Sequence, residues 1–429
     1  MTTPANRPAQ TQSSPLPPRP LLTRPLLLRF VSLVGASVGF FLLLSVVPAY
    51  AAESGGGGAA GLATGALMLA TVLGELVTPR LVDRLGYRTV LIAGLFLLGA
   101  PALALTASRD MAWIVAVCLL RGLGFALTIV AGGALTATLI PTERRGEGLA
   151  LVGVVSGVPS LIALPLGPWL AEHAGYGTVA VVAGGVTLAV IASVFGLPDR
   201  GERVGQNAGE GTGHDTHAER PLGVLPGLRT PTLLRPVLVF AATATAAGIL
   251  VTFLPLAAGS ASSGVVAAAL FAQPAAATVT RWLAGRHADR HGGAGLVLPG
   301  LLVSAAGVLI TAATGSPVAV IAGSTLFGAG FGIAQNATLT LMYARVSASS
   351  YGTVSALWNL AYDGGMGVGA AGFGVLAGVT GYPWAFAGTA ALMLLALAPA
   401  LRDLRHKDLH HRDPGHRDPG HRDPDHKDY

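Results

Sequence analysis

The stretch Pro79-Arg80-Leu81-Val82-Asp83-Arg84-Leu85-Gly86 decides the fold, because its Asp-Arg-x-Gly pattern returns 206 residues later without a gap. Asp83, Arg84 and Gly86 recur as Asp289, Arg290 and Gly292. A constant offset over a long stretch indicates two equivalent halves in tandem. The same offset relates further pairs along the chain, namely Gly122 and Gly328, Gly124 and Gly330, Phe125 and Phe331, Gly146 and Gly352, Gly175 and Gly381, and Tyr176 and Tyr382.

The composition places both halves in a lipid bilayer. Of the 429 residues, 52% are hydrophobic and 11% are charged, with a mean hydropathy of +0.61, whereas soluble domains carry about 25% charged residues. A helix needs about 20 apolar residues to cross about 30 Å of hydrocarbon. Stretches of about this length occur at 26–48, 59–78, 89–108, 112–138, 148–171, 178–197, 233–256, 263–283, 294–314, 317–342, 352–377 and 383–402.

Twelve spans divide evenly between the two halves, which gives both halves the same orientation in the membrane. The predicted fold is an all-α membrane protein of twelve transmembrane helices, in two six-helix halves related by a tandem repeat. Two parallel repeats in a membrane are typical of a transporter.

The segments outside the spans have a different composition. The first 25 residues are rich in Pro and Thr and lack a small-residue cleavage pattern, which predicts a disordered leader before an uncleaved first helix. The C-terminal tail repeats His-Arg-Asp-Pro-Gly, which cannot build a core. The expected division is a leader at 1–25, an N-terminal half at 26–198, a cytoplasmic linker at 199–232, a C-terminal half at 233–403 and a disordered tail at 404–429.

Arginine placement predicts the orientation, since short loops rich in Lys and Arg stay in the cytoplasm. We therefore expect a multi-pass monomer in the cytoplasmic (inner) cell membrane, with both termini and the linker in the cytoplasm. The net charge of +6 follows from this bias, and without interleaved aromatic residues it does not indicate nucleic-acid binding. The arginines assigned to cytoplasmic loops are Arg80, Arg84, Arg88, Arg144, Arg145, Arg281, Arg286, Arg290 and Arg345.

Both copies of the repeated motif resemble the G-x-x-x-D-R-x-G signature of the major facilitator superfamily, and the resemblance covers roughly residues 26–402. The first copy has Pro79 in place of the leading glycine. The resemblance implies a conformational latch between the halves, in which Asp accepts from a helix N-terminus, Arg pairs with an acid and Gly permits a tight turn. The expected latch residues are Asp83, Arg84, Gly86, Gly285, Asp289, Arg290 and Gly292, with Glu75 as a latch partner.

Two charged residues lie near the middle of expected spans, where an ion costs several kcal/mol. Arg121 lies in the fourth span, whose Gly-rich surroundings resemble the fourth-helix motif of proton-linked members of the superfamily; the family's Arg stands about three positions earlier, at Cys118 here. Asp363 lies about eleven residues into the eleventh span, near the bilayer centre. We predict that Asp363 carries a proton and that Arg121 serves the substrate or the coupling. Static bracing is the alternative for both, through a mutual ion pair or a Tyr hydrogen bond.

Polar residues on the other spans predict a substrate cavity. The surrounding residues are small and apolar, which suits an amphipathic or hydrophobic solute better than a sugar. No phosphate loop, catalytic triad or zinc-ligand spacing occurs in the sequence, so we predict no enzyme activity, no cofactor and no metal site in the spans. Metal binding by the His-containing tail stays open. The expected cavity residues are Thr243, Gln273, Gln335, Asn336, Asn359 and Tyr362.

These features predict a secondary transporter that couples efflux of a small drug or metabolite to protons by alternating access. Its partners would be that solute, protons and the lipid bilayer. Export is expected because residues 157–168 carry part of the Gly-Pro signature of the superfamily's antiporters. Two alternatives stay open: an exporter of a metal-chelating metabolite such as a siderophore, with Arg121 on the anionic groups, and a non-transporting membrane sensor or scaffold.

Overall fold

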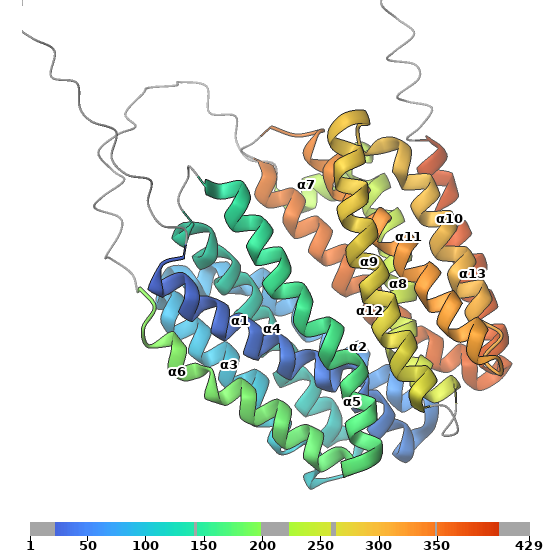
Figure 1. Cartoon of the computed structure of the whole chain (residues 1–429), viewed down its shortest axis with the longest axis horizontal. Helices are drawn as coiled ribbons and strands as arrows, with labels where there is room; N and C mark the ends of the chain where they lie inside the picture. Colours follow the sequence, from blue (N-terminus) through green and yellow to red (C-terminus); the bar gives the residue numbers. More distant parts are fainter. Residues whose placement is uncertain (1–21, 141–143, 199–222, 259–262, 348–349, 403–429) are drawn as a thin grey trace, which may run out of the picture.

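The computed structural model describes residues 22–140, 144–198, 223–258, 263–347 and 350–402 (Figure 1). Helices dominate these residues, and no strand occurs among them. Their bounds are α1 (Arg24–Leu44), α2 (Val46–Leu85), α3 (Tyr87–Leu103), η1 (Leu105–Ala107), α4 (Met111–Leu139), α5 (Arg145–Ala189), α6 (Ile191–Val194), α7 (Val224–Arg229), α8 (Pro231–Ala257), α9 (Ser263–His291), α10 (Ala294–Thr311), α11 (Pro317–Tyr343), α12 (Tyr351–Thr380) and α13 (Tyr382–Leu394).

The helices provide the twelve predicted spans. Eight apolar segments of the described residues are long enough to cross a membrane, and two of them, Arg24–Leu85 and Leu151–Val194, have 62 and 44 residues. Each of these two holds two crossings, because non-helical backbone at Gly55 and Gly56 divides the first and Gly175 divides the second. α9 and α12, helices of 29 and 30 residues, supply the remaining two crossings, and both carry charged residues.

The repeat extends to the backbone at four glycines. Gly86 and its counterpart Gly292 have φ of 87° and 79°, and Gly175 and its counterpart Gly381 have φ of 81° and 78°. Residues with a side chain rarely adopt this conformation, which explains why the Asp-Arg-x-Gly motif ends on glycine. We call the end of the bundle that carries Gly86 and Gly292 the Asp-Arg end, and the end that carries Gly175 and Gly381 the opposite end.

The Asp-Arg-x-Gly motifs belong to helix ends, whereas the sequence placed them in loops. α2 continues through Pro79 to Leu85, and α9 continues to His291. Hydropathy shows where a span leaves the hydrocarbon, but a helix can continue into water as long as its residues favour it. Each motif therefore forms the last turns of a helix that ends at its glycine.

The expected leader, linker and tail lie mostly outside the described residues, so their disorder stays a prediction. α1 begins at Arg24 inside the expected leader. The short helix α7 lies inside the expected flexible linker, and it packs against α8 and α12. The linker is therefore helical in its last part.

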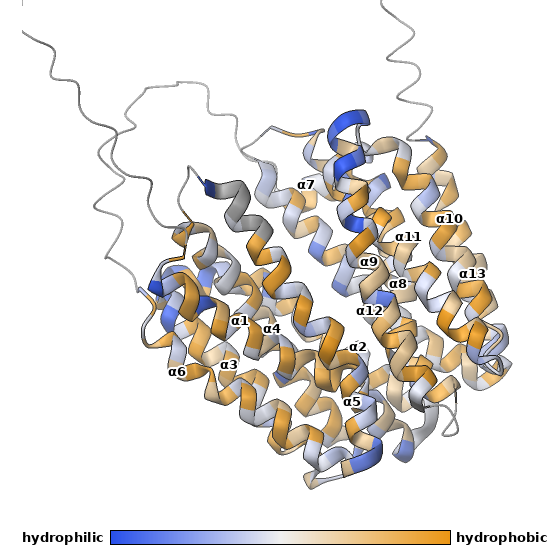
Figure 2. Cartoon of the chain, viewed as in Figure 1, coloured by the Kyte–Doolittle hydropathy of each residue, from blue (hydrophilic) through white to orange (hydrophobic). Residues whose placement is uncertain are grey.

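Each half has its own apolar core. One core is built from α1 to α6 and the other from α8 to α13. Figure 2 shows apolar residues along the flanks of the helices and hydrophilic residues gathered at their ends, as a bilayer requires. The two cores meet chiefly along α2, which packs against α12 and α8 of the other half, and α5 packs against α9.

The contact of α2 with α12 depends on small residues. A Cβ on Gly61 would lie 2.3 Å from the carbonyl oxygen of Ala370, and a Cβ on Gly374 would lie 2.4 Å from that of Gly57. The backbones of the two halves thus touch directly, as small residues allow between membrane helices. We call this contact the glycine seam, defined by Gly57, Gly61, Gly65, Gly367, Ala370 and Gly374.

The seam lies toward the opposite end, where further contacts join the halves. The hydroxyls of Thr64 in α2 and Thr252 in α8 are hydrogen-bonded at 3.1 Å. Trp169 of α5 and Phe271 of α9 line a shared pocket on the other side of the bundle. In Figure 1 the ribbons of α5 and α9 separate from there toward the Asp-Arg end. The structure therefore has its halves joined at the opposite end.

Gly61→Ala is expected to open the seam without unfolding either half, because the added methyl meets backbone of the other half. Overpacking of this kind costs about 1 to 3 kcal/mol, and that cost falls on the joined state. Spin labels at Glu172 and Val379, in a Cys118→Ala background, should report a longer separation at the opposite end. Gly58→Ala is the matched control, since a Cβ there has no neighbour within 4 Å; equal distances in both variants would contradict the seam.

Candidate functional site

A pair of carboxyl groups joins the two halves inside the membrane. Asp363 of α12 is 6% exposed, and its side chain is hydrogen-bonded with that of the partly buried Glu75 of α2. The pair lies where the glycine seam ends: Gly367, four residues after Asp363, contacts Met68, seven residues before Glu75. The sequence identified Asp363, but it assigned Glu75 to the latch and did not pair the two.

The pair can hold a proton between the halves. Two ionised carboxylates only accept hydrogen bonds, so a hydrogen bond between two carboxyl groups needs a proton on one of them. In a buried site two like charges this close disfavour joint ionisation. A proton bound by the pair would therefore hold α2 against α12, and two ionised carboxylates at these positions would repel each other.

Arg281 and Tyr362 lie at the same depth as the pair. Glu75 is ten residues from the end of α2, Asp363 is twelve from the start of α12 and Arg281 is ten from the end of α9. At 1.5 Å per residue, each lies about 15 to 18 Å from the Asp-Arg end of its helix. The Arg281 guanidinium interacts electrostatically with the Tyr362 hydroxyl, which lies beside Asp363.

The sequence treated Arg281 as a loop arginine that sets orientation, and the structure corrects this. Arg281 lies within α9, ten residues before its end, and its side chain is exposed. Among the described residues no acid forms an ion pair with it. The signal was present in the sequence, because residue 281 falls inside the expected span 263–283.

Aromatic rings surround Tyr362 on the C-terminal half. Trp358 lies one turn before it with a parallel ring at 6.1 Å, and Phe240 of α8 stacks on Trp358 at 4.4 Å. Phe331 of α11 lies 6.1 Å from Tyr362. Tyr362 packs against the cores of both halves. The sequence predicted Tyr362 for the cavity and missed Trp358.

Arg121 is fully enclosed in the N-terminal half and contacts no acid among the described residues. It is 1% exposed, and one terminal nitrogen donates to the Gly39 carbonyl of α1 at 3.3 Å. The other two nitrogens, Nε and Nη1, have no partner. The ion pair with Asp363 that we considered does not form in this state.

A second arginine, Arg29, is equally buried and was missed. Its Nε donates to the Gly132 carbonyl of α4 at 3.1 Å, and its Nη1 donates to Ser32 at 2.9 Å. A Cβ on Gly132 would lie 2.0 Å from the guanidinium, so glycine is needed there. Arg29 thus fastens α1 to α4, and its position inside the expected span 26–48 was the one sign of burial in the sequence.

The predicted polar cavity residues do not gather at one site. Thr243 is completely buried and donates to the Phe240 carbonyl of its own helix at 2.8 Å. Gln273 is buried where α9 packs against Gly328 of α11. Asn336 lies beside Gly285, near the Asp-Arg end rather than midway. Asn359 of α12 and Gln335 of α11 are partly buried, as are Asn336 and Tyr362.

The two aspartates of the expected latch are solvent-facing in this state. Asp83 and Asp289 are exposed, and among the described residues neither carboxylate has a hydrogen-bond or ion-pair partner. Arg84 and Arg290 are exposed as well. A latch at the Asp-Arg end should be open when the halves are joined at the opposite end, so the geometry is compatible with that role.

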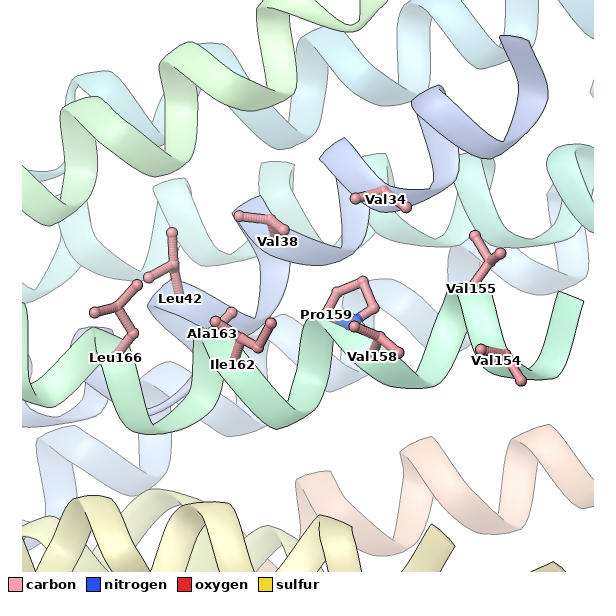
Figure 3. Close-up of a pocket in the computed structure, with 10 residues that line it drawn as sticks. All are labelled: Val34, Val38, Leu42, Val154, Val155, Val158, Pro159, Ile162, Ala163 and Leu166. Atoms are coloured by element: carbon pink, nitrogen blue, oxygen red, sulfur yellow. The ribbon is translucent and has the colours of Figure 1, made fainter. Parts of the chain in front are cut away.

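An apolar pocket of about 360 Å³ lies between α1 and α5 of the N-terminal half (Figure 3). Val38 and Leu42 contribute from α1, and Val158 and Ile162 contribute from α5. All ten lining residues are apolar, which suits a hydrocarbon group and not a charged one. Pro159 is part of this wall and belongs to the Gly-Pro segment noted in the sequence.

The comparisons with known proteins agree on the family. The family model described as Major Facilitator Superfamily matches residues 29–370 and 237–424, whereas no curated protein matches the chain. The solved nucleoside transporter NupG is similar, with 12% identity, coverage of 90% of this chain and 100% of that one, and a TM-score of 0.68. The human organic anion transporter MFSD10 has 18% identity, coverage of 88% and 99%, and a TM-score of 0.59. Because the family model spans both tandem halves and the shared fold covers nearly the whole bundle, the chain belongs to the Major Facilitator Superfamily of membrane transporters.

Proposed function

We propose that this transporter is proton-coupled and that the Glu75–Asp363 pair carries the proton. The observation that supports the proposal is the hydrogen bond between two carboxyl groups on opposite halves, at the end of the seam. Two acids at this depth are expected to have a functional role, because ionisable groups inside a membrane protein are costly and usually mark proton or substrate pathways.

The cycle follows from the pair's two protonation states. With the proton bound, the pair adds to the seam and favours the state that is open toward the Asp-Arg end, expected to face the cytoplasm. Release of the proton to the cytoplasm leaves two carboxylates that repel each other across the halves. Separation of α2 from α12 relieves that repulsion and exposes the site on the other side, where a new proton is loaded.

We propose export of a small amphipathic or hydrophobic solute as the direction of transport. A proton that moves into the cell down its gradient returns the carrier to the cytoplasm-facing state, in which the carrier can bind solute again. The apolar pocket between α1 and α5 supports a substrate with a hydrocarbon part, and Pro159 in its wall belongs to the segment that favours antiport.

The test begins with cells that lack the protein. Solutes that accumulate in these cells, relative to cells that express it, are identified and then assayed in proteoliposomes under an imposed proton gradient. We expect solute movement against its gradient that stops when a protonophore removes the proton gradient. Binding without pH-dependent movement would instead support the sensor alternative and contradict the proposal.

The latch hypothesis makes a separate prediction for the Asp-Arg end. Asp83→Asn or Asp289→Asn should slow the complete cycle by about fivefold or more, since each removes a charge-assisted contact worth about 1.5 to 3 kcal/mol in the state that is closed at that end. Solute binding and expression should stay at the parental level, because both residues are exposed here. Parental flux in both variants would show that these acids only help to set the topology.

A further inference from the structure

Arg281 of α9 and the side chains of Trp358 and Tyr362 on α12, here called the wall, carry hydrogen-bond donors without acceptors. The Arg281 guanidinium has five N–H groups, no acceptor function and no acid partner among the described residues. The indole Nε1 of Trp358 is buried without a partner. No hydrogen bond within the described residues occupies the Tyr362 hydroxyl. A ligand that satisfies this wall must bring acceptors.

The same wall offers flat apolar surface. Trp358 and Tyr362 lie one helical turn apart with ring planes only 8° apart, and Phe240 stacks behind Trp358 with planes 15° apart. Trp358 and Tyr362 are partly exposed, whereas Phe240 is completely buried. Flat rings in a rigid stack bind a planar ring through offset stacking, worth about 0.5 to 1.5 kcal/mol beyond burial.

An arginine beside stacked rings matches a planar anion in particular. Its guanidinium binds a carboxylate through two parallel hydrogen bonds, and this geometry distinguishes it from lysine. The pocket between α1 and α5 of the N-terminal half is lined by apolar residues alone, so it can hold the hydrocarbon part of such an anion.

We propose that Arg281, Tyr362 and Trp358 form an anion subsite, and that the substrate is an aromatic organic acid in its carboxylate form. This inference deepens the proposed function, on which it rests for the idea that the bound molecule is transported. A carboxylate here adds negative charge near the Glu75–Asp363 pair. Once the pair has lost its proton, the added charge strengthens the repulsion across the seam and so favours the step that carries the anion outward.

Equilibrium dialysis on the detergent-solubilised full chain tests the subsite without any proton gradient. The probes are 2-naphthoate, its neutral amide 2-naphthamide, and cyclohexanecarboxylate, which keeps the charge without the aromatic ring. We expect the parent protein to bind 2-naphthoate more tightly than either of the other probes. Arg281→Gln should weaken 2-naphthoate binding by about tenfold or more, and Arg281→Lys should lose part of the affinity because it keeps the charge but not the planar fork.

Two further variants serve as a matched control and as a second, independent test of the subsite. Arg286→Gln removes a charge five residues along the same helix, from an exposed arginine stacked on Trp282 at 4.3 Å, and should bind like the parent. Trp358→Phe keeps a ring but removes the N–H, and should weaken 2-naphthoate binding by about two- to tenfold. This variant addresses the subsite even if Arg281→Gln lowers the yield of folded protein.

The outcomes separate the two proposals. Failure of the parent to bind 2-naphthoate at millimolar concentration, or equal binding of 2-naphthoate and 2-naphthamide, would overturn the subsite. Parental affinity in Arg281→Gln would do the same. Tighter binding of 2-naphthoate than of 2-naphthamide, without proton-dependent flux, would support the subsite and overturn the coupling. Proton-driven flux of a solute, with equal binding of the two probes, would support the coupling and overturn the subsite.

Discussion

Asp363→Asn is expected to abolish uphill transport while solute binding and exchange persist. Asparagine matches the protonated acid in shape and cannot ionise, so it imitates a loaded Asp363. Its amide can still donate to Glu75 and hold α2 against α12 in the state described here. The carrier should therefore move solute in both directions by exchange, without a proton to drive net accumulation.

Glu75→Gln should behave in the same way, because a shared proton needs both carboxyl groups. The Glu75→Gln, Asp363→Asn double variant should add little to either single variant, as expected for residues that act as one unit. A purely structural role predicts otherwise: breaking a buried pair by removing one partner costs about 3 to 5 kcal/mol, which would lower yield and thermal stability.

The measurement compares proton-driven accumulation with counterflow in proteoliposomes for the parent, both single variants and the double variant. Flux driven by the proton gradient should fall to the level of liposomes without protein, and counterflow should stay near the parental rate. Asp363→Glu, which keeps a titratable group, is the control and should retain part of the coupling. An Asp363→Asn protein that still concentrates its solute would remove this acid from the mechanism.

The pair also predicts how pH shifts the resting conformation. The hydrogen bond between the carboxyls exists while the pair holds its proton, so its contribution to the joined state is present at low pH and is lost as the pH rises through proton release. Labels at Glu172 and Val379 should therefore move apart with rising pH. In the Glu75→Gln, Asp363→Asn double variant the distance should not change with pH.

Local pattern in the sequence predicted the architecture well. The tandem offset of Asp83 and Asp289, together with apolar length, predicted two six-helix halves, and the fold and the family model confirm both. Gly86 and Gly292 could be recognised as turn residues because their conformation is a local property of the chain. Helix ends were less predictable, since hydropathy marks the hydrocarbon boundary and not the last hydrogen bond.

The partners of the buried charges were not predictable. Glu75 and Asp363 are 288 positions apart in the sequence, and only the packing of α2 on α12 brings them together. Arg281 was assigned to a cytoplasmic loop from the distribution of arginines along the chain, although residue 281 falls inside the expected span 263–283. Thr243 failed as a cavity residue because a hydroxyl on a helix can satisfy itself on its own backbone, which removes the need for a polar environment.

Arg121→Met is expected to raise thermal stability and to abolish transport. Arg29→Met is expected to lower thermal stability. Both arginines are 1% exposed in the same half, so they form a matched pair. Arg29 makes bonds of 3.1 and 2.9 Å, and its replacement removes both bonds to the charged group, at a cost of about 1.5 to 3 kcal/mol. Arg121 makes one bond of 3.3 Å and has two unpartnered nitrogens, so removal of its charge stabilises this state.

An unpaired buried cation that lowers stability is retained only where function needs it, which is why we expect Arg121 to gain its partner in another step of the cycle. Arg121→Lys keeps the charge but loses the planar fork, so a bidentate role predicts a large loss of flux in this variant too. The measurements are the midpoint of thermal unfolding in detergent and proton-driven flux in proteoliposomes, for both methionine variants and Arg121→Lys. If Arg121→Met and Arg121→Lys both transport like the parent, Arg121 serves only the packing of α4 on α1.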